Sequence, residues 1–230
     1  MSARADTPAR RGAQPLVARA YAEIKRRILD GEYPAGHQAT EPDVAADLGM
    51  SRTPVREALI RLAQEGLVEV VPRRGMRVVP LSPEDMAEIY EVLTALESEA
   101  AGLAARRRPD PRRFDVIATA VDDMAAALRG RDLRAWAAAD ERFHRALLDL
   151  SGNRRLIALA VTMWDQVHRA RLATVRLRPL PYRSNTEHRA LLAALRRGDE
   201  QRARDLHRQH RLRTARVLIS LLRQHDVGEV

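Results

Sequence analysis

The sequence has 230 residues, which is enough for two modest domains that each bury a hydrophobic core. Apolar residues make up 45% of it but aromatic residues only 3%, which favours cores of packed helices over a β-sandwich. The lack of cysteine excludes disulfides and thiolate metal sites, while the formal net charge of +9 permits a polyanionic partner without identifying one.

Residues 1–15 are basic and lack the apolar segment of a secretory signal peptide, so we interpret them as a flexible basic arm. The longest uncharged stretches, such as residues 156–164, are far shorter than the roughly 20 apolar residues that span a bilayer. We therefore expect a cytoplasmic protein without a membrane segment.

The first folded domain is expected at residues 16–80. Apolar side chains recur at helical spacing between Pro15 and Asp30, which predicts a first amphipathic helix. Thr40 and Asp43 have the spacing of a capping box, so a short second helix should follow. The short turn GMS separates this helix from the next one.

The third predicted helix begins after Ser51 and stops at Gly66. Two strands rich in β-branched residues follow at residues 67–71 and 76–79, and the tight turn PRRG connects them. This order of elements is typical of a helix-turn-helix with a wing.

A second, all-helical domain is expected at residues 81–230. Ser82 can cap its first helix, and Pro83 suits the first helical position. Breaks rich in Pro, Gly, Asp and Asn separate the expected helices, which are residues 83–107, 111–129, 132–150, 153–176, 185–197 and 200–224. Because no strand pattern interrupts them, we predict a mainly α fold in which the winged domain precedes a helical bundle.

The third predicted helix carries residues suited to reading base edges in a major groove. Arg52 and Arg56 lie four residues apart near its N-terminus, and each can donate two hydrogen bonds to a guanine. Two arginines alone could be a solvated helix face, but their combination with a turn and a basic wing favours DNA. The wing glycine permits a close backbone approach. The predicted DNA-contacting residues are Thr40, Ser51, Arg52, Thr53, Arg56, Arg73, Arg74 and Gly75.

The stretch from TEPDVAADLG to PRRGMRVVP resembles the winged helix-turn-helix of the GntR superfamily of bacterial transcription regulators. The segments SRTPVREAL and PRRG carry this resemblance, which extends over residues 16–80. It implies that Arg52 and Arg56 read guanines and that Gly75 leads the wing into the minor groove. Ala39 stands where the family usually has leucine, which weakens a packing contact and leaves the DNA-reading residues unchanged.

Three histidines and one aspartate fall on inward faces of the predicted bundle. Asp140 and His144 project from one side of a helix, together with apolar residues. His188 and His210 lie in the apolar stripes of two other helices. A divalent cation would satisfy all four groups, whose unpaired burial would be costly. Each group also has an ordinary explanation, either a helix-face pair or a hydrogen bond to a neighbouring helix.

Residues 83–224 resemble the FCD ligand-binding domain of the FadR-type branch of GntR regulators, mainly in DERFHRALLDLSGNRRL and EHRALLAALRRGDEQRARDLHRQH. The resemblance implies a small carboxylate effector at open positions of a divalent metal, commonly zinc or nickel. Leu93 stands where the family has arginine, so we expect fewer cations around an anionic effector. The metal ligands implied by the resemblance are Asp140, His144, His188 and His210.

The remaining histidines have other interpretations. His207 is expected beside the apolar stripe that contains His210, at a position where the family often has methionine. His168 has no assignable partner. His37 and His225 are expected to be exposed to solvent.

Together these features predict a metabolite-responsive transcription repressor that binds a palindromic operator as a homodimer and has no enzymatic activity. We expect its signal to pass through the linker at residues 80–83 and the long helix that follows. A metal-dependent hydrolase is one alternative, but the sequence has no HExxH motif and a winged helix has no evident purpose in such an enzyme. A non-specific architectural DNA-binding protein is the other alternative.

Overall fold

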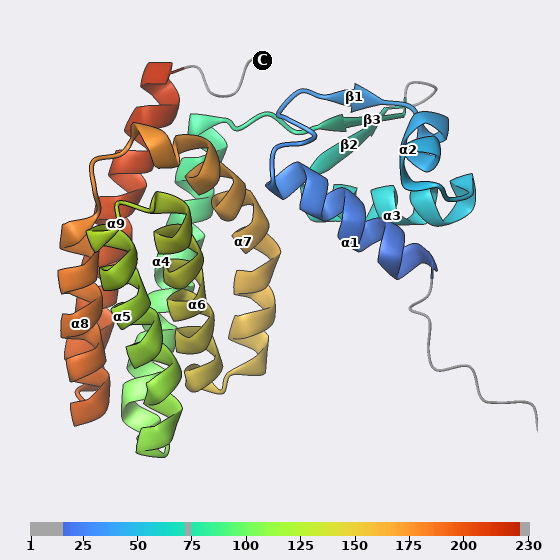
Figure 1. Cartoon of the computed structure of the whole chain (residues 1–230). Coiled ribbons are helices and arrows are strands. Elements are labelled where there is room, and N and C mark those ends of the chain that lie inside the picture. The colour runs from blue at the N-terminus through green and yellow to red at the C-terminus, as the bar shows by residue number, and fades with distance from the viewer. Residues whose placement is uncertain (1–15, 72–74, 226–230) are drawn as a thin grey trace, which may run out of the picture.

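The computed structural model describes residues 16–71 and 75–225, so the predicted basic arm and the wing-turn residues Arg73 and Arg74 lie outside the described residues. A small unit of helices and strands comes first, and a bundle of long helices follows it (Figure 1). The predicted fold class, mainly α with an N-terminal winged helix-turn-helix and a C-terminal helical bundle, is confirmed.

The first unit contains α1 (Leu16–Leu29), β1 (Gln38–Ala39), α2 (Glu41–Leu48), α3 (Arg52–Gln64), β2 (Val68–Val71) and β3 (Gly75–Val78). Its strands form one antiparallel sheet in the order β1-β3-β2. The sequence did not predict β1, because a strand of two residues is too short to show an alternating pattern. Its pairing with β3 exists only in the folded unit.

Capping interactions fix the ends of the two short helices. The hydroxyl of Thr40 accepts a hydrogen bond from the Asp43 backbone N–H, and the Asp43 carboxylate accepts one from the Thr40 backbone N–H. The predicted capping box is therefore present, and Gly49 ends α2 with a left-handed φ of 60°. Ser51 occupies the predicted N-cap position of α3, but its side chain makes no capping hydrogen bond.

The bundle contains α4 (Pro83–Arg107), η1 (Pro111–Phe114), α5 (Asp115–Arg129), α6 (Leu133–Ser151), α7 (Arg154–Thr174), η2 (Val175–Leu177), α8 (Tyr182–Arg197) and α9 (Glu200–His225). Two helices of the bundle begin at residues other than the predicted ones. Residues 111–114 form a 3₁₀ turn, and α8 begins at Tyr182 because Pro181 suits the entry to a helix. None of the helices in the described ranges combines the length and apolar content that a bilayer span requires.

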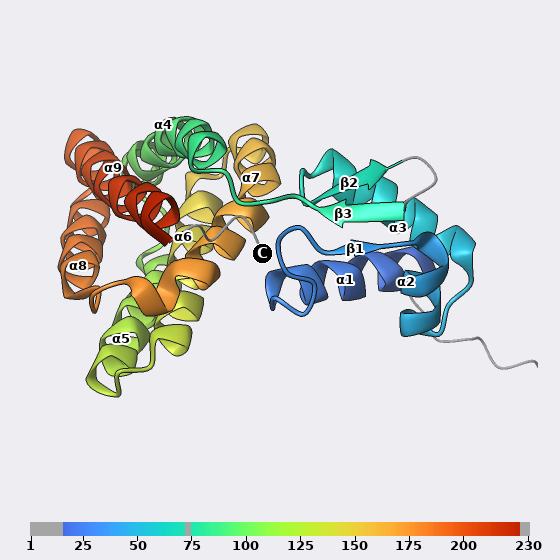
Figure 2. The ribbon, with the colours of Figure 1, turned by 90° about the horizontal axis from the view of Figure 1, so that it is seen from above.

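Two hydrophobic cores hold the bundle together. One lies mainly among α5, α6, α8 and the C-terminal half of α4, and the other among α4, α7 and α9. Viewed from above, α4 and α9 run beside each other, and α8 and α5 lie further from the first unit (Figure 2). Leu93 is completely buried in the second core, which explains why an apolar residue is accepted there.

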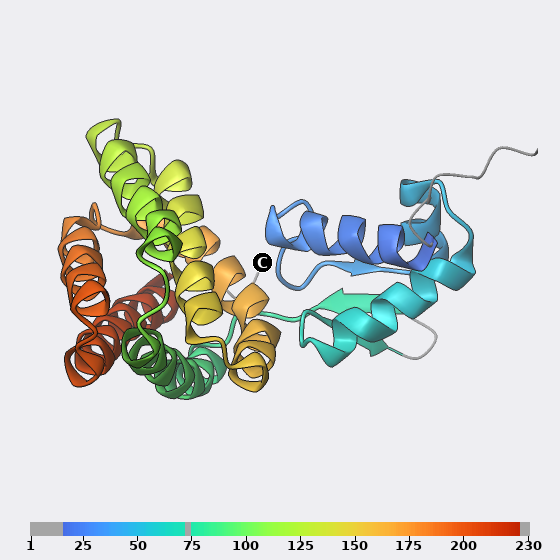
Figure 3. The same ribbon diagram turned by 90° about the horizontal axis from the view of Figure 1, so that it is seen from below.

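Helix α7 is the part of the bundle that faces the first unit, as all three ribbon views show (Figures 1, 2 and 3). The Lys25 ammonium in α1 lies 2.6 Å from Asp165 Oδ2 in α7 and 2.9 Å from Glu65 Oε2 at the end of α3. Gln166 Nε2 donates a hydrogen bond of 3.0 Å to the Glu65 backbone carbonyl. These polar contacts fix the bundle against both long helices of the first unit.

Candidate nucleic-acid interface and metal centre

The N-terminal end of α3 presents its arginines to solvent. The side chains of Arg52 and Arg56 are 69% and 70% exposed, and Thr53 between them is exposed as well. The buried face of the same helix, with Val55 and Leu59, packs into the core of the unit. The folded unit therefore places the predicted base-reading residues on its open side.

Glu41 is a member of this surface that the sequence reasoning missed. Its carboxylate lies 3.8 Å from Arg52 Nη2 and 3.8 Å from Arg56 Nε. This one carboxylate holds the two guanidinium groups close to each other, and the three groups together keep a net positive charge. The only sequence signal for it is its position directly after Thr40, the N-cap of α2.

Gly75 starts β3 where the wing meets β1. Its φ is +89°, and a Cβ at this position would collide with the Ala39 carbonyl oxygen and the Thr40 Cα atom. Glycine is therefore required here for close packing between strands, in addition to any approach to DNA. Thr40 also has a local role, because its hydroxyl contacts the Asp43 carboxylate.

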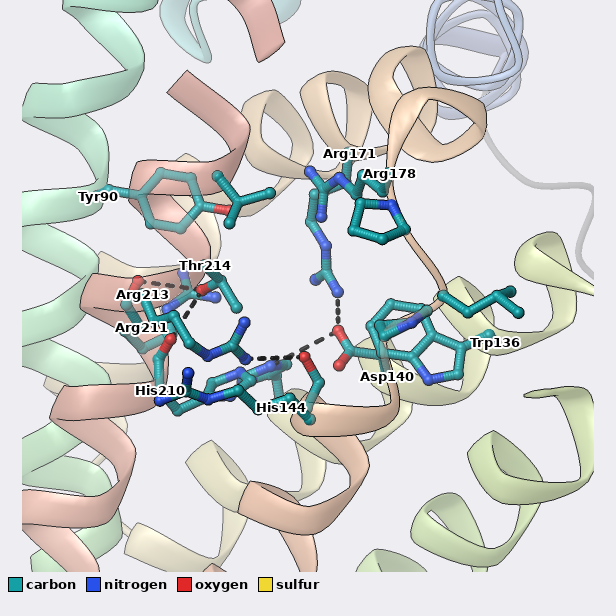
Figure 4. A pocket seen from close by; sticks show the side chains of 16 residues that line it. Tyr90, Trp136, Asp140, His144, Arg171, Arg178, His210, Arg211, Arg213 and Thr214 are labelled. Carbon is teal, nitrogen blue, oxygen red and sulfur yellow. Dashed lines mark hydrogen bonds and ion pairs between the residues drawn. The ribbon is translucent and has the colours of Figure 1, made fainter. Parts of the chain in front are cut away.

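A cavity of about 350 Å³ opens in the bundle between α4, α6, α7, α8 and α9 (Figure 4). Tyr90, Trp136 and Thr214 contribute apolar surface and hydroxyl groups to its wall. Trp136 is held by a hydrogen bond of 2.9 Å from its indole N–H to Asn185 Oδ1. Two of the predicted metal ligands, Asp140 and His144, project from α6 toward this space.

The structure brings the four predicted metal ligands together. Ring nitrogens of His144, His188 and His210 lie within 4.8 Å of one another. Asp140 Oδ2 is 3.6 Å from His144 Nε2, and Asp140 Oδ1 is 3.6 Å from His188 Nε2. All four residues are at most 4% exposed, and they come from three helices, α6, α8 and α9.

The donor set fits a divalent metal ion. Among the described residues, His188 has no hydrogen-bond partner for either ring nitrogen. Asp140 lies beside Arg171 but has no hydrogen-bond partner for either carboxylate oxygen. Burial lowers the pKa values of His188 and His210 well below their ordinary value, so these rings are neutral and have lone pairs at neutral pH. Tetrahedral ligands are about 3.4 Å apart, so small shifts would complete a site with nitrogen and oxygen ligands.

Two carboxylates, the buried Glu97 and the partly exposed Glu187, orient two of these imidazoles. His144 Nδ1 lies 3.2 Å from Glu97 Oε2, and His210 Nδ1 lies 2.7 Å from Glu187 Oε2. A hydrogen on each Nδ1 would satisfy these contacts and leave each Nε2 lone pair for a ligand. Carboxylate partners of this kind are typical of metal-binding histidines.

Glu97 is the central acceptor of the buried polar network. Trp164 donates to it at 3.0 Å, His207 Nε2 lies 2.9 Å away, and Arg211 Nε lies 3.3 Å away. Burial alone would raise the pKa of Glu97, but Arg211 and His144 hold it well below its usual value. Because the Glu97 oxygens already have cationic and N–H partners, we interpret Glu97 and His207 as a support for the predicted metal ligand His144.

The prediction for His207 was wrong. We expected it beside the apolar stripe, but its side chain is fully buried and contacts Glu97. Helix α9 packs against both α4 and α8, so a wider face of it is buried than one stripe predicts. Burial lowers the pKa of His207 to about 4, although Glu97 opposes this shift.

The other histidines lie outside the cluster. His168 Nδ1 is 2.9 Å from Glu141 Oε2, which identifies the partner that the sequence did not indicate. His37 is only partly exposed, because its ring stacks on Tyr33 with 4.7 Å between the centroids. His225 is exposed at the end of α9, as expected.

The expectation of fewer cations around the effector than in other family members stays a prediction. Leu93 removes an arginine from α4, but other elements supply arginines that the sequence reasoning missed. Those that line the cavity come from α7, the segment before α8, α8 itself and α9, and they are Arg171, Arg178, Arg183, Arg211 and Arg213.

Comparison with protein families gives two adjacent matches. Residues 16–78 match the family described as bacterial regulatory proteins, gntR family, and residues 88–213 match the family described as FCD domain. The first match covers the winged unit, and the second covers the helices that form the cavity.

Individual relatives agree with these matches. An Agrobacterium vitis protein, described as an uncharacterized HTH-type transcriptional regulator in the TAR-I ttuE-ttuC' intergenic region, is 47% identical over 57% of this chain and 78% of its own. A probable D-xylose utilization operon transcriptional repressor of Paenarthrobacter nicotinovorans is 32% identical over 78% of each chain. The solved structure of McbR/YncC from E. coli has a TM-score of 0.77 at 22% identity, covers 90% of this chain and 99% of its own, and so shares the fold.

Proposed function

Since the chain belongs to the GntR family of bacterial regulatory proteins and carries an FCD domain, we propose that it is a cytoplasmic transcription repressor that responds to a small carboxylate. The resemblance to FadR-type GntR regulators is confirmed by both family matches. The similarity to the probable transcriptional repressor of Paenarthrobacter nicotinovorans supports the repressor assignment.

One observation carries the proposal for DNA. Arg52 and Arg56 are exposed side by side at the N-terminus of α3, while the opposite face of that helix is anchored in a core. A rigid helix with two exposed guanidinium forks fits a major groove, and each fork can contact a guanine. We propose that Ser51, Thr53 and Thr40 contribute phosphate contacts at the same surface.

We further propose that two copies bind a palindromic operator. One recognition helix reads only a few base pairs, so a second half-site multiplies both affinity and specificity. Selection from a random pool of duplexes should enrich an inverted repeat whose half-sites are separated by about one helical turn or a multiple of it. Enrichment of a single asymmetric site would contradict the homodimer, and no enrichment at all would support the architectural alternative.

We propose that Asp140, His144, His188 and His210 hold a divalent ion, zinc or nickel. A bound ion would supply positive charge and open coordination positions for a carboxylate effector. Glu97 and Glu187 keep two of the histidines in a suitable orientation. We assign no catalytic role to the site, because the same chain exposes a DNA-reading surface, which a hydrolase does not need.

We propose that α7 couples the cavity to the DNA-binding unit. On one side, Arg171 pairs with the predicted metal ligand Asp140. Two residues earlier, Arg169 Nη2 donates a hydrogen bond of 2.6 Å to the Val79 carbonyl, directly before the linker at residues 80–83. A shift of α7 caused by a ligand would therefore act on the linker directly.

The junction contacts of α7 extend this route. Asp165 contacts Lys25, and Gln166 contacts Glu65. Residues 165–171, which are less than two turns of α7, therefore contact the cavity, the linker and the DNA-binding unit. The sequence predicted a route through the linker and α4, and that prediction remains compatible with these contacts. An effector can regulate only if it favours one arrangement of this junction.

The variant D165A/Q166A should uncouple the two units. In the wild type we expect a saturating cavity ligand to change operator affinity by roughly 5- to 150-fold, the usual size of such coupling. In the variant this ratio should fall to about threefold or less, while ligand affinity is retained, because the polar junction contacts are lost. Fluorescence anisotropy with labelled operator, with and without ligand, measures the ratio.

The matched control is R154A/R155A, at the exposed start of the same helix and away from the junction. It should retain the wild-type ratio. A D165A/Q166A protein with undiminished coupling would exclude the junction as the route and leave α4 as the remaining candidate.

A further inference from the structure

The cavity of Figure 4 carries more positive charge than nearby carboxylates balance. Five arginines line it, namely Arg171, Arg178, Arg183, Arg211 and Arg213. Among the described residues, the carboxylates within ion-pair distance of these arginines are Asp140, Glu97 and Glu187. Five arginines and three carboxylates leave an excess of two positive charges, without counting any metal ion.

Arg178 has no carboxylate partner in the described part of the chain. Its Nε and Nη2 atoms donate hydrogen bonds of 3.2 and 2.9 Å to one acceptor, the Thr174 hydroxyl. Burial lowers the pKa of Arg178 and lowers that of Arg171 to about 10, yet both remain protonated at neutral pH. A partly buried guanidinium with one hydroxyl partner is costly unless an anion joins it.

Arg211 provides a second cationic group on a different wall. Its side chain is only 3% exposed, and its Nη2 atom has no hydrogen-bond partner among the described residues. The guanidinium lies over the Tyr90 ring, 4.8 Å from the ring centroid, and this contact holds it in place. Figure 4 shows Arg211 on the α9 side of the cavity and Arg178 on the α7 side.

We propose that the effector carries two anionic groups, one held by Arg178 and the other by Arg211. The inference rests on the proposed function, since it takes this cavity as the effector site. A guanidinium fork matches a planar carboxylate or a phosphate, and two forks on separate walls match a ligand charged at both ends. The volume of about 350 Å³ is near the lower limit of the roughly 300 to 1,000 Å³ of small-molecule sites, which suits a short acid.

Pairs of acids that differ in one charged group test the proposal. The probes are succinate against butyrate, adipate against hexanoate, and 3-phosphoglycerate against glycerate, with full-length protein of fixed metal content. At least one doubly anionic probe should bind at least tenfold more tightly than its partner in calorimetric titration. The first two pairs test a second carboxylate, and the third tests a phosphate. Equal affinities within all three pairs would overturn the proposal.

The variant R178M separates a ligand-binding role from a structural one. It should reduce the preference for the doubly anionic probe to about twofold or less. The melting temperature of the ligand-free protein should rise or stay the same, because the variant removes a partly buried charge without a counter-ion. A preserved preference, or a clearly lower melting temperature of the free protein, would show that Arg178 is not an anion site.

Two further samples complete the design. R176Q removes one exposed arginine two residues away and should keep the wild-type preference. R178K retains the charge without the fork and should keep part of the preference. Operator binding is measured on the same preparations. Protein that binds operator but shows no preference for doubly anionic probes refutes this inference alone. Protein that binds no duplex refutes the proposed function, and its preference for doubly anionic probes can still be measured.

Discussion

Replacement of both Arg52 and Arg56 by alanine should abolish selective binding to the operator. A bidentate contact to guanine contributes about 1–3 kcal/mol of discrimination, so loss of two contacts in each half-site should weaken operator binding by at least roughly 30-fold. Binding to unrelated duplexes should weaken far less, because it depends on charge and not on base edges. Anisotropy titrations with the selected operator and a scrambled duplex, at two salt concentrations, measure both effects.

A matched control separates base reading from net charge. The variant R196A/R197A removes the same number of positive charges from the exposed end of α8 in the other unit. It should retain the ratio between operator and scrambled affinities. If R52A/R56A also retained this ratio, the assignment of α3 as the recognition helix would be wrong.

Removal of two cluster histidines should eliminate the bound metal. The wild type should contain about one divalent ion per chain, and H188A/H210A should contain almost none by elemental analysis. At 1,000 times the dissociation constant, a ligand of the folded state adds about 4 kcal/mol of stability. The melting temperature of the variant should therefore equal that of chelator-treated wild type, and chelator should not lower it further.

Single variants distinguish the alternatives within the cluster. H225A, at the exposed end of α9, should keep the metal, and so should H207A, because its ring contacts Glu97 instead. E97Q should bind the metal roughly 10- to 100-fold more weakly, since it removes the charged partner of His144. Full metal content in H188A/H210A, or its complete loss in H207A alone, would overturn the ligand assignment.

Much of the fold could be predicted because its helices depend on local signals. The capping box at Thr40, the Ser82 cap of α4 and the apolar periodicity of each helix are all visible within short segments. β1 could not be predicted, because its two residues are a strand only through pairing with β3. The start of α8 at Tyr182 was missed since prolines before it resemble a loop.

The candidate site also contains residues that could be predicted from the sequence and residues that could not. The four proposed metal ligands were found because each lies in the inward stripe of a helix. Glu97 could have been found by the same rule, as it lies four residues after Leu93 and four before Ala101, both buried. Arg171 and Arg178 could not be found in this way, because their convergence on the cavity depends on how α7 and the segment after it pack, and no local pattern contains this information.

The junction between the two units has one chemical peculiarity. The sequence contains 40 basic residues, and Lys25 is the only lysine among them. Its ammonium group is shared between Glu65 and Asp165, on opposite sides of the boundary. Acylation of lysine, which removes the charge of an amine and leaves arginine intact, therefore has a single side-chain target in this sequence. Such a modification would act on the connection between DNA reading and ligand sensing, and on no other lysine-dependent contact.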